Sequence, residues 1–114
     1  MYLKEAMTKA DALRPNMISD DQKAAWIYEL EGKIAEMMDV LTPENAFPGD
    51  AQLLTPPPYD NIYELYLAAM IDYYHEESAL YANDMAMFNT ALAEARAWWR
   101  REHRPKSGGS WEVM

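Results

Sequence analysis

The strongest pattern in the chain is an apolar stripe between residues 60 and 103. Apolar side chains recur there in alternating steps of four and three residues, the spacing of an amphipathic helix. They are Tyr63, Leu67, Met70, Tyr74, Tyr81, Met85, Phe88, Leu92, Ala95 and Trp99. The stripe weakens between His75 and Ser78, where Glu76 and Glu77 occupy apolar positions. This predicts two helices, over 60–75 and 78–103, with a break between them. A single long kinked helix is the alternative.

The first of these helices carries a second apolar row beside the first. Its members are Ile62, Tyr66, Ala69 and Tyr73. Together the two rows form an apolar arc that is wider than one neighbouring helix covers. We therefore predict that one face of this helix packs in the chain's own core and that the other contacts a partner.

Two further helices are predicted in the first 41 residues. One covers 2–13, and Pro15 ends it because a proline pushes the preceding residue out of the helical region; its apolar face holds Leu3, Ala6, Met7, Ala10 and Leu13. Ser19 and Gln22 have the spacing of a capping box and open a second helix that reaches about Val40. Its buried stripe is expected to be Ile27, Leu30, Ile34, Met37 and Leu41, flanked by Trp26 and Met38.

Residues 41–59 contain five of the seven prolines, so no helix crosses them. The run Thr55-Pro56-Pro57-Pro58-Tyr59 favours an extended polyproline II spacer, and Asp60 is the expected N-cap of the next helix. Recognition of this run by an SH3 or WW domain is the alternative, but the run lacks a PxxP pattern with a flanking basic residue.

These patterns predict an all-α fold: a small bundle of about four helices with a long proline-rich loop between helices 2 and 3. Residues 1–104 are expected to form a single domain, and residues 105–114 a flexible basic and apolar C-terminal tail that carries Trp111. The chain has no cysteine, so disulfides and thiolate metal sites are excluded. No apolar run approaches the roughly 20 residues of a membrane-spanning helix, and the first residues lack the apolar core of a signal peptide. We expect no membrane contact.

Charge is distributed unevenly along the chain. Residues 1–95 hold 17 acids and 5 bases, a net charge of −12, whereas residues 96–114 hold 2 acids and 5 bases, a net charge of +3. An acidic body repels the phosphate backbone, so duplex binding through a basic patch is not expected. The basic residues complement the C-terminal dipole of the last helix, or they contact an acidic partner.

One group of residues resembles a metal site. Asp72, His75 and Glu76 lie on one helical face at spacings of three and four residues. A di-metal bundle needs a second such pair, but the only other histidine, His103, has no acid three residues before it. No nucleophile turn, phosphate-binding glycine loop or zinc spacing occurs either. We therefore predict no catalytic, cofactor-binding or metal-binding residues and no enzyme activity. A metal-binding helical bundle enzyme is the remote alternative.

The order of short segments along the chain resembles a known family. The segments are Ala12-Leu13-Arg14-Pro15-Asn16, Ser19-Asp20-Asp21-Gln22-Lys23, Trp26-Ile27-Tyr28-Glu29-Leu30-Glu31-Gly32-Lys33-Ile34, Pro58-Tyr59-Asp60-Asn61-Ile62-Tyr63-Glu64-Leu65-Tyr66-Leu67, Ile71-Asp72-Tyr73 and Tyr81-Ala82-Asn83-Asp84-Met85-Ala86-Met87-Phe88-Asn89. This string resembles the head-tail connector (adaptor, head-completion) proteins of tailed phages and prophages, over most of residues 10–103. The chain departs from the family at His75-Glu76, where relatives have Asn-Gly, and in its basic tail with Trp111.

The resemblance implies a structural virion assembly protein. Its protomers would form a homo-oligomeric ring, twelvefold when assembled, beneath the portal protein and next to a tail-side stopper or completion protein. DNA would pass through the channel without sequence-specific binding. The expected location is the head-tail junction of the virion, and the host cytoplasm during assembly.

The predicted subunit or portal interface combines the second apolar face with the basic segment. Its candidate residues are Tyr63, Tyr66, Tyr73, Arg100, Arg101, Arg104 and Trp111. An acidic protein-interaction module or a DNA-mimic inhibitor is the alternative function, because it would also explain the net charge of −9.

Overall fold

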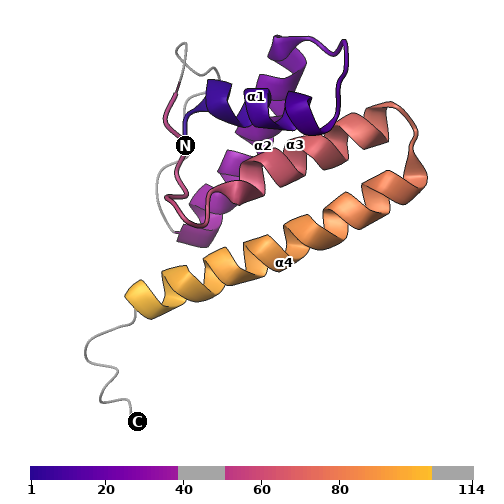
Figure 1. Cartoon of the computed structure of the whole chain (residues 1–114). Helices are drawn as coiled ribbons and strands as arrows, with labels where there is room; N and C mark the ends of the chain where they lie inside the picture. The colour runs from indigo at the N-terminus through magenta and orange to yellow at the C-terminus, as the bar shows by residue number, and fades with distance from the viewer. Residues whose placement is uncertain (39–50, 104–114) are drawn as a thin grey trace, which may run out of the picture.

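The computed structural model describes residues 1–38 and 51–103, and nearly all of the regular structure in these ranges is helical. One isolated backbone bridge joins Tyr2 to Gln52. The described helices are α1 (Leu3–Leu13), α2 (Asp20–Met38), α3 (Asn61–Tyr74) and α4 (Ser78–Glu102) (Figure 1). The all-α prediction is confirmed. Most of the expected loop between α2 and α3 lies outside the described residues.

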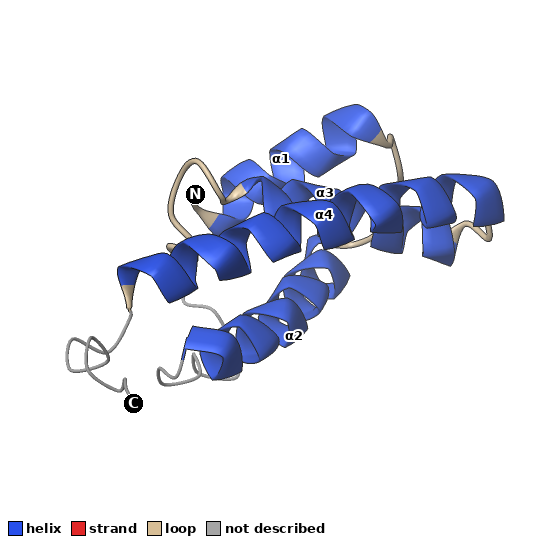
Figure 2. Cartoon of the chain, turned by 90° about the horizontal axis from the view of Figure 1, so that it is seen from below, coloured by secondary structure: helices blue, strands red, loops and turns tan. Residues whose placement is uncertain are grey.

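Helix α3 is the centre of the fold, and α1, α2 and α4 all pack against it (Figures 1 and 2). Its buried apolar residues include Tyr63 and Leu67 of the first predicted row and Ile62 and Ala69 of the second, together with Ala68 and Ile71, which were in neither row. The chain's own helices therefore cover Ile62 and Ala69 of the second row, and the prediction that these two residues face a partner is wrong. Contact of Tyr66 and Tyr73 with a partner stays a prediction. The apolar residues of α3 that keep partial or full exposure are Leu65, Tyr66, Met70, Tyr73 and Tyr74.

The first two helices follow their predicted spacing closely. Leu3, Ala6 and Ala10 are buried on α1, and Ile27, Leu30 and Ile34 are buried on α2. The Ser19 hydroxyl accepts a hydrogen bond from the Gln22 amide at 3.2 Å, so the first half of the predicted capping box is confirmed. Leu13 was expected in the core but is 48% exposed, because α1 ends there and the chain turns away before Pro15. Val40 and Leu41 lie outside the described residues.

The predicted break between the last two helices is confirmed. Helix α3 ends at Tyr74 and α4 begins at Ser78. Glu76 has a φ of 59°, in the left-handed region, and this reverses the chain so that α4 runs back along α3 (Figure 1). A single kinked helix is excluded.

Residues 51–60 form a folded connection to α3. The Tyr59 amide donates to the Pro56 carbonyl at 2.9 Å, so the chain turns here and the polyproline II prediction is wrong. The Pro57-Pro58 peptide bond is cis. Asp60 makes no side-chain cap, contrary to the prediction, because its carboxylate lies 3.3 Å from the Met1 amino group instead.

Candidate functional site

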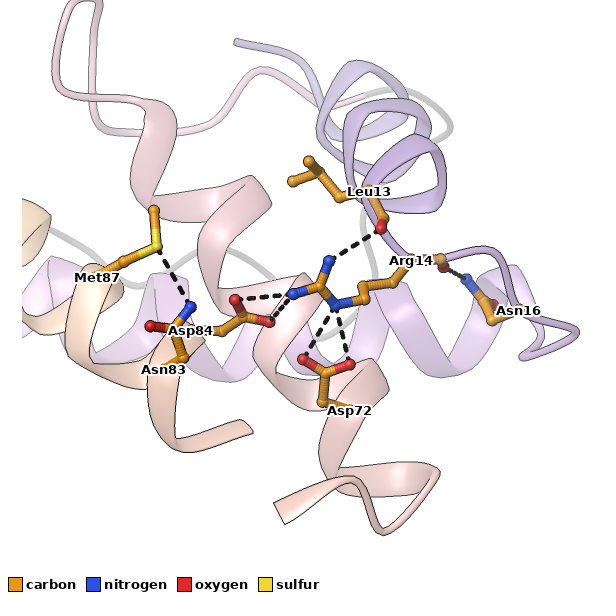
Figure 3. Close-up of polar contacts among 7 residues, drawn as sticks. All are labelled: Leu13, Arg14, Asn16, Asp72, Asn83, Asp84 and Met87. Carbon is orange, nitrogen blue, oxygen red and sulfur yellow. Dashed lines mark hydrogen bonds and ion pairs between the residues drawn. The ribbon is translucent and has the colours of Figure 1, made fainter. Parts of the chain in front are cut away.

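A buried charged junction joins α1, α3 and α4 (Figure 3). Arg14, the residue after α1, donates from Nε to both carboxylate oxygens of Asp72 at 3.1 and 3.2 Å. Its Nη2 donates to both oxygens of Asp84 at 3.1 and 3.0 Å, and Nη1 donates to the Leu13 carbonyl at 3.0 Å. One guanidinium therefore holds one carboxylate from each helix of the α3–α4 pair, using the fork geometry that only arginine offers.

The two carboxylates of this junction influence each other. Burial and a hydrogen bond with Asp72 raise the pKa of Asp84 to about 6, while the Arg14 charge pulls that pKa down. Asp72 and Asp84 are 2% and 4% exposed, so a substrate has almost no access to them. The junction is suited to fixing three helices together.

The candidate metal group does not form in the described structure. Asp72 points to Arg14, whereas His75 and Glu76 are exposed on the turn between α3 and α4. Within residues 1–38 and 51–103, no three His, Cys, Asp or Glu side chains are arranged to hold a metal ion. Asp72 therefore belongs to the charged junction.

A second buried polar cluster fixes residues 54–55 against α2 and α3. The Glu31 carboxylate accepts from the Tyr63 hydroxyl at 2.5 Å and from the Leu54 amide at 2.8 Å, and the Thr55 amide donates to the Tyr63 hydroxyl at 2.8 Å. Burial raises the pKa of Glu31; burial and then the Glu31 charge raise the pKa of Tyr63. Tyr63 is 0% exposed. It is therefore a core residue here and not on a surface that a partner reaches.

The other predicted interface residues lie at two separate places. Tyr73 is 64% exposed at the end of α3 next to the turn. Arg100 and Arg101 are exposed near the C-terminal end of α4, where Arg101 donates to the Tyr59 hydroxyl at 3.5 Å. Tyr66 is partly buried between these places. Arg104 and Trp111 lie outside the described residues.

A groove runs between α2 and α4, with Tyr66 of α3 at its floor, and we call it the α2–α4 groove. It consists of two hollows of about 260 and 490 Å³, which share Lys33, Met37 and Arg96. The first is mainly apolar and is also lined by Leu30, Ile34, Tyr66, Met85, Phe88 and Leu92. The second adds Glu36, Trp99 and Arg100. Three cations and one acid thus surround one end of an apolar groove.

The opposite side of α4 has a different hollow, the far flank. It has a volume of about 380 Å³ and is lined by Asn61, Leu65, Ala86, Met87, Thr90, Ala91 and Glu94. Met87 is half exposed there, and Glu94 is the only charged residue of the lining. Helix α4 therefore has an apolar hollow on each side. The rim of the α2–α4 groove is cationic, and the far flank is acidic.

The turn between α3 and α4 forms a third surface, the α3–α4 tip. A hollow of about 410 Å³ is lined there by Tyr73, Glu76, Glu77, Ser78 and Tyr81. The Tyr73 and Tyr81 rings pack with their centroids 5.6 Å apart. The tip combines the exposed ring of Tyr73 and the partly buried ring of Tyr81 with two carboxylates.

The sequence reasoning missed Asp84 and Glu31 as buried charges and Arg14 as the cation of the charged junction. The available signal was an acid on the apolar face of a predicted helix, since Asp84 and Glu31 each stand three or four residues from core positions. Nothing in the spacing indicates that Arg14, 58 residues before Asp72, completes the junction. Lys33 and Arg96 were also not foreseen as the two rims of one groove.

Comparisons of the chain with protein-family models, with curated proteins and with solved structures give no match. None of the helices in the described part of the chain has the length and hydropathy needed to cross a membrane.

Proposed function

We propose that this chain is a structural assembly protein without catalysis, a head-tail connector subunit that forms a ring under a portal protein and extends the DNA channel. Besides the family resemblance of its segments, one observation carries the proposal. Helix α4 leaves an apolar hollow open on each of its two sides.

A ring subunit needs two different contact surfaces, because each subunit meets its neighbours through heterologous, head-to-tail contacts. The α2–α4 groove and the far flank differ in charge, since the first has Lys33 and Arg96 at its rim and the second has Glu94. Opposite charges across such a contact fix its register and disfavour contacts between like surfaces. This arrangement supports a closing ring with α4 between two neighbours.

The charge of the chain also supports passage of DNA. An excess of acids over residues 1–95 repels phosphates. A channel wall of this charge would let DNA slide without tight contacts.

Binding to the portal complex encoded in the same genome tests the proposal. We expect the full-length chain to cosediment with the purified portal, and Met87→Lys to weaken this, because a new cation in the far flank would face Lys33 and Arg96 of the neighbouring subunit. Thr8→Lys adds the same charge at an exposed α1 position and should bind like the wild type. Absence of portal binding by the folded wild-type chain would overturn the connector proposal.

A further inference from the structure

One face of the protomer has a charge gradient along its length. A row of α4 residues at steps of three or four shares one side of the helix, from the tip to the groove. The row is Ser78, Tyr81, Met85, Phe88, Leu92, Arg96 and Trp99. The tip hollow and both hollows of the α2–α4 groove therefore open along the same face. The far flank, with Met87, Thr90 and Glu94, lies on another side of α4.

The two ends of this face have opposite charge. The tip lining contains Glu76 and Glu77 and no base, a net charge of −2. The hollow at the other end contains Lys33, Arg96 and Arg100 against Glu36, a net charge of +2. The hollow between them is mainly apolar, with Arg96 and Lys33 only at its edge. The face has the composition of an interface, with an apolar centre and charged ends.

These opposite charges are too far apart to meet within one chain. Ser78 and Arg96 stand 18 residues apart on one continuous helix, a separation of about 27 Å at the helical rise of about 1.5 Å per residue. A second copy that lies antiparallel on this face would place each acidic tip on the other copy's cationic end. A two-fold axis through the apolar centre creates both contacts at once.

We propose that the free protein forms an antiparallel two-fold dimer through this face, with the occupant of each α2–α4 groove being a second copy of the same chain. Within the dimer, Glu76 and Glu77 of one copy lie opposite Lys33 and Arg96 of the other. The proposal goes beyond the proposed connector function, since it concerns the chain before any ring exists. If that function also holds, the dimer covers one side of α4 and is incompatible with the ring.

The small area of this face limits the affinity of the dimer. A strip about 27 Å long and one interhelical spacing of about 10 Å wide covers on the order of 300 Å² per protomer. A stable complex buries about 800 Å² per partner, so this contact is transient. Because exposed charges provide the complementarity, the dimer should weaken as salt shortens the Debye length. Covalent trapping is the appropriate measurement.

The absence of cysteine in the chain allows a clean cross-linking test. Ser78→Cys places one thiol at the tip, and Met37→Cys places one at the cationic end without altering any charge. The two variants are mixed, one of them isotopically heavy, and treated with a short bis-maleimide. We expect more mixed dimer than either like pair, with a lower yield at high salt. Thr90→Cys on the far flank replaces Met37→Cys in the control mixture and should give only random pairing.

The double variant with both Ser78→Cys and Met37→Cys distinguishes the symmetry. An antiparallel dimer closes with two cross-links and stops at two chains, whereas a head-to-tail contact gives a ladder of longer products. A ladder would overturn the two-fold arrangement. If the Met37→Cys and Thr90→Cys mixtures gave equal yields of mixed dimer at high protein concentration, the proposal that the dimer forms through the α2–α4 groove face would be wrong. All of these measurements use the isolated chain, so they succeed or fail independently of portal binding.

Charge reversal gives a second test of the same contact. Introducing Glu76→Lys and Glu77→Lys into the Ser78→Cys chain should reduce its cross-linking to the Met37→Cys chain. Lys33→Glu and Arg96→Glu in the Met37→Cys chain should then restore the yield, because each reversed end meets its complement. Circular dichroism verifies that each variant is folded. A yield that does not recover in the reversed pair would contradict the proposed pairing of the ends.

Discussion

Arg14 bonds to three parts of the chain through one guanidinium. It ends α1, and its guanidinium contacts Asp72 of α3 and Asp84 of α4 (Figure 3). Without it, two buried carboxylates would face each other with no common cation. The energetic cost of such unpaired buried charges is larger than the net value of an ion pair.

Arg14→Ala should therefore lower the free energy of unfolding by about 3 kcal/mol, the lower end of the range for breaking a buried ion pair, since Arg14 is 26% exposed. Urea unfolding followed by circular dichroism measures this change. Arg14→Lys keeps the charge, but a single ammonium cannot bond both carboxylates in a planar fork. The free energy of unfolding of Arg14→Lys should therefore lie between those of the wild type and Arg14→Ala. An Arg14→Ala protein as stable as the wild type would refute this role.

Asp84 gives the protein a specific pH dependence. Its pKa is about 6 in the folded protein, against an ordinary value of 3.8, so the folded state binds this proton more tightly than the unfolded chain does. By linkage, the contribution of Asp84 to stability is greatest below pH 3.8 and is lost as the pH rises through about 6.

Asp84→Asn removes this titration while it keeps an oxygen that accepts from Arg14. The stability of the wild type relative to Asp84→Asn should therefore fall as the pH rises between 3.8 and about 6 and then level off. Unfolding free energies of both proteins at several pH values measure the difference. A difference that rises with pH over this range would contradict the assignment.

Single residues of the core could be predicted only where the helical spacing of apolar residues indicated them. Ile27, Leu30 and Ile34 stand at helical spacing and are buried as expected. Tyr63 was correctly placed on an apolar row, but its hydroxyl partners, Glu31 and Thr55, come from segments that are distant in sequence or irregular. A period along one helix contains no information about which distant side chain completes a hydrogen bond.

At the scale of elements, α4 is the least covered helix. Of its 25 residues, only Asp84, Phe88, Ala91 and Ala95 are buried. It packs along α3 and leaves both sides open as hollows. Helix α3, in contrast, has seven of its 14 residues buried, because the other three helices pack against it.

The turn between these helices depends on Glu76, which has a φ of 59°. A non-glycine residue in the left-handed region costs roughly 1–2 kcal/mol, a cost that glycine avoids at some expense in entropy. Glu76→Gly should therefore stabilise the protein by about 1 kcal/mol, measured as a shift of the urea midpoint. Glu77 has a φ of −93°, so the control Glu77→Gly should give no such gain. Equal effects of the two substitutions would show that the turn is not under backbone strain.

The helices could be predicted from the sequence, but the connection before α3 could not. Helical periods and the residues that end them located α1 to α4 to within one or two residues where the structure describes both ends. Residues 55–59 suggested an extended spacer from composition, whereas their turn is accompanied by a stack of Tyr59 on Trp98 with centroids 5.2 Å apart. This tertiary contact joins the connection to α4, and no local pattern indicates it.

At the scale of the whole molecule, the described helices form an elongated protomer with distinct surfaces at its ends and sides. The acidic tip, the cationic end of the α2–α4 groove and the far flank all involve α4. The sequence predicted that aromatic and basic residues serve contacts, and this stays a prediction. It could not predict the groove itself, because this depends on how α2 and α4 diverge over α3 (Figure 2).

The central claim is that this protomer assembles into a ring on a portal. Electron microscopy of the full-length chain mixed with the portal complex of the same genome tests it most directly. We predict a closed ring that is coaxial with the narrow end of the portal, with α4 between neighbouring subunits and the α2–α4 groove and far flank inside the contacts. Portal particles without added density, at a protein concentration where the chain is folded, would contradict the account.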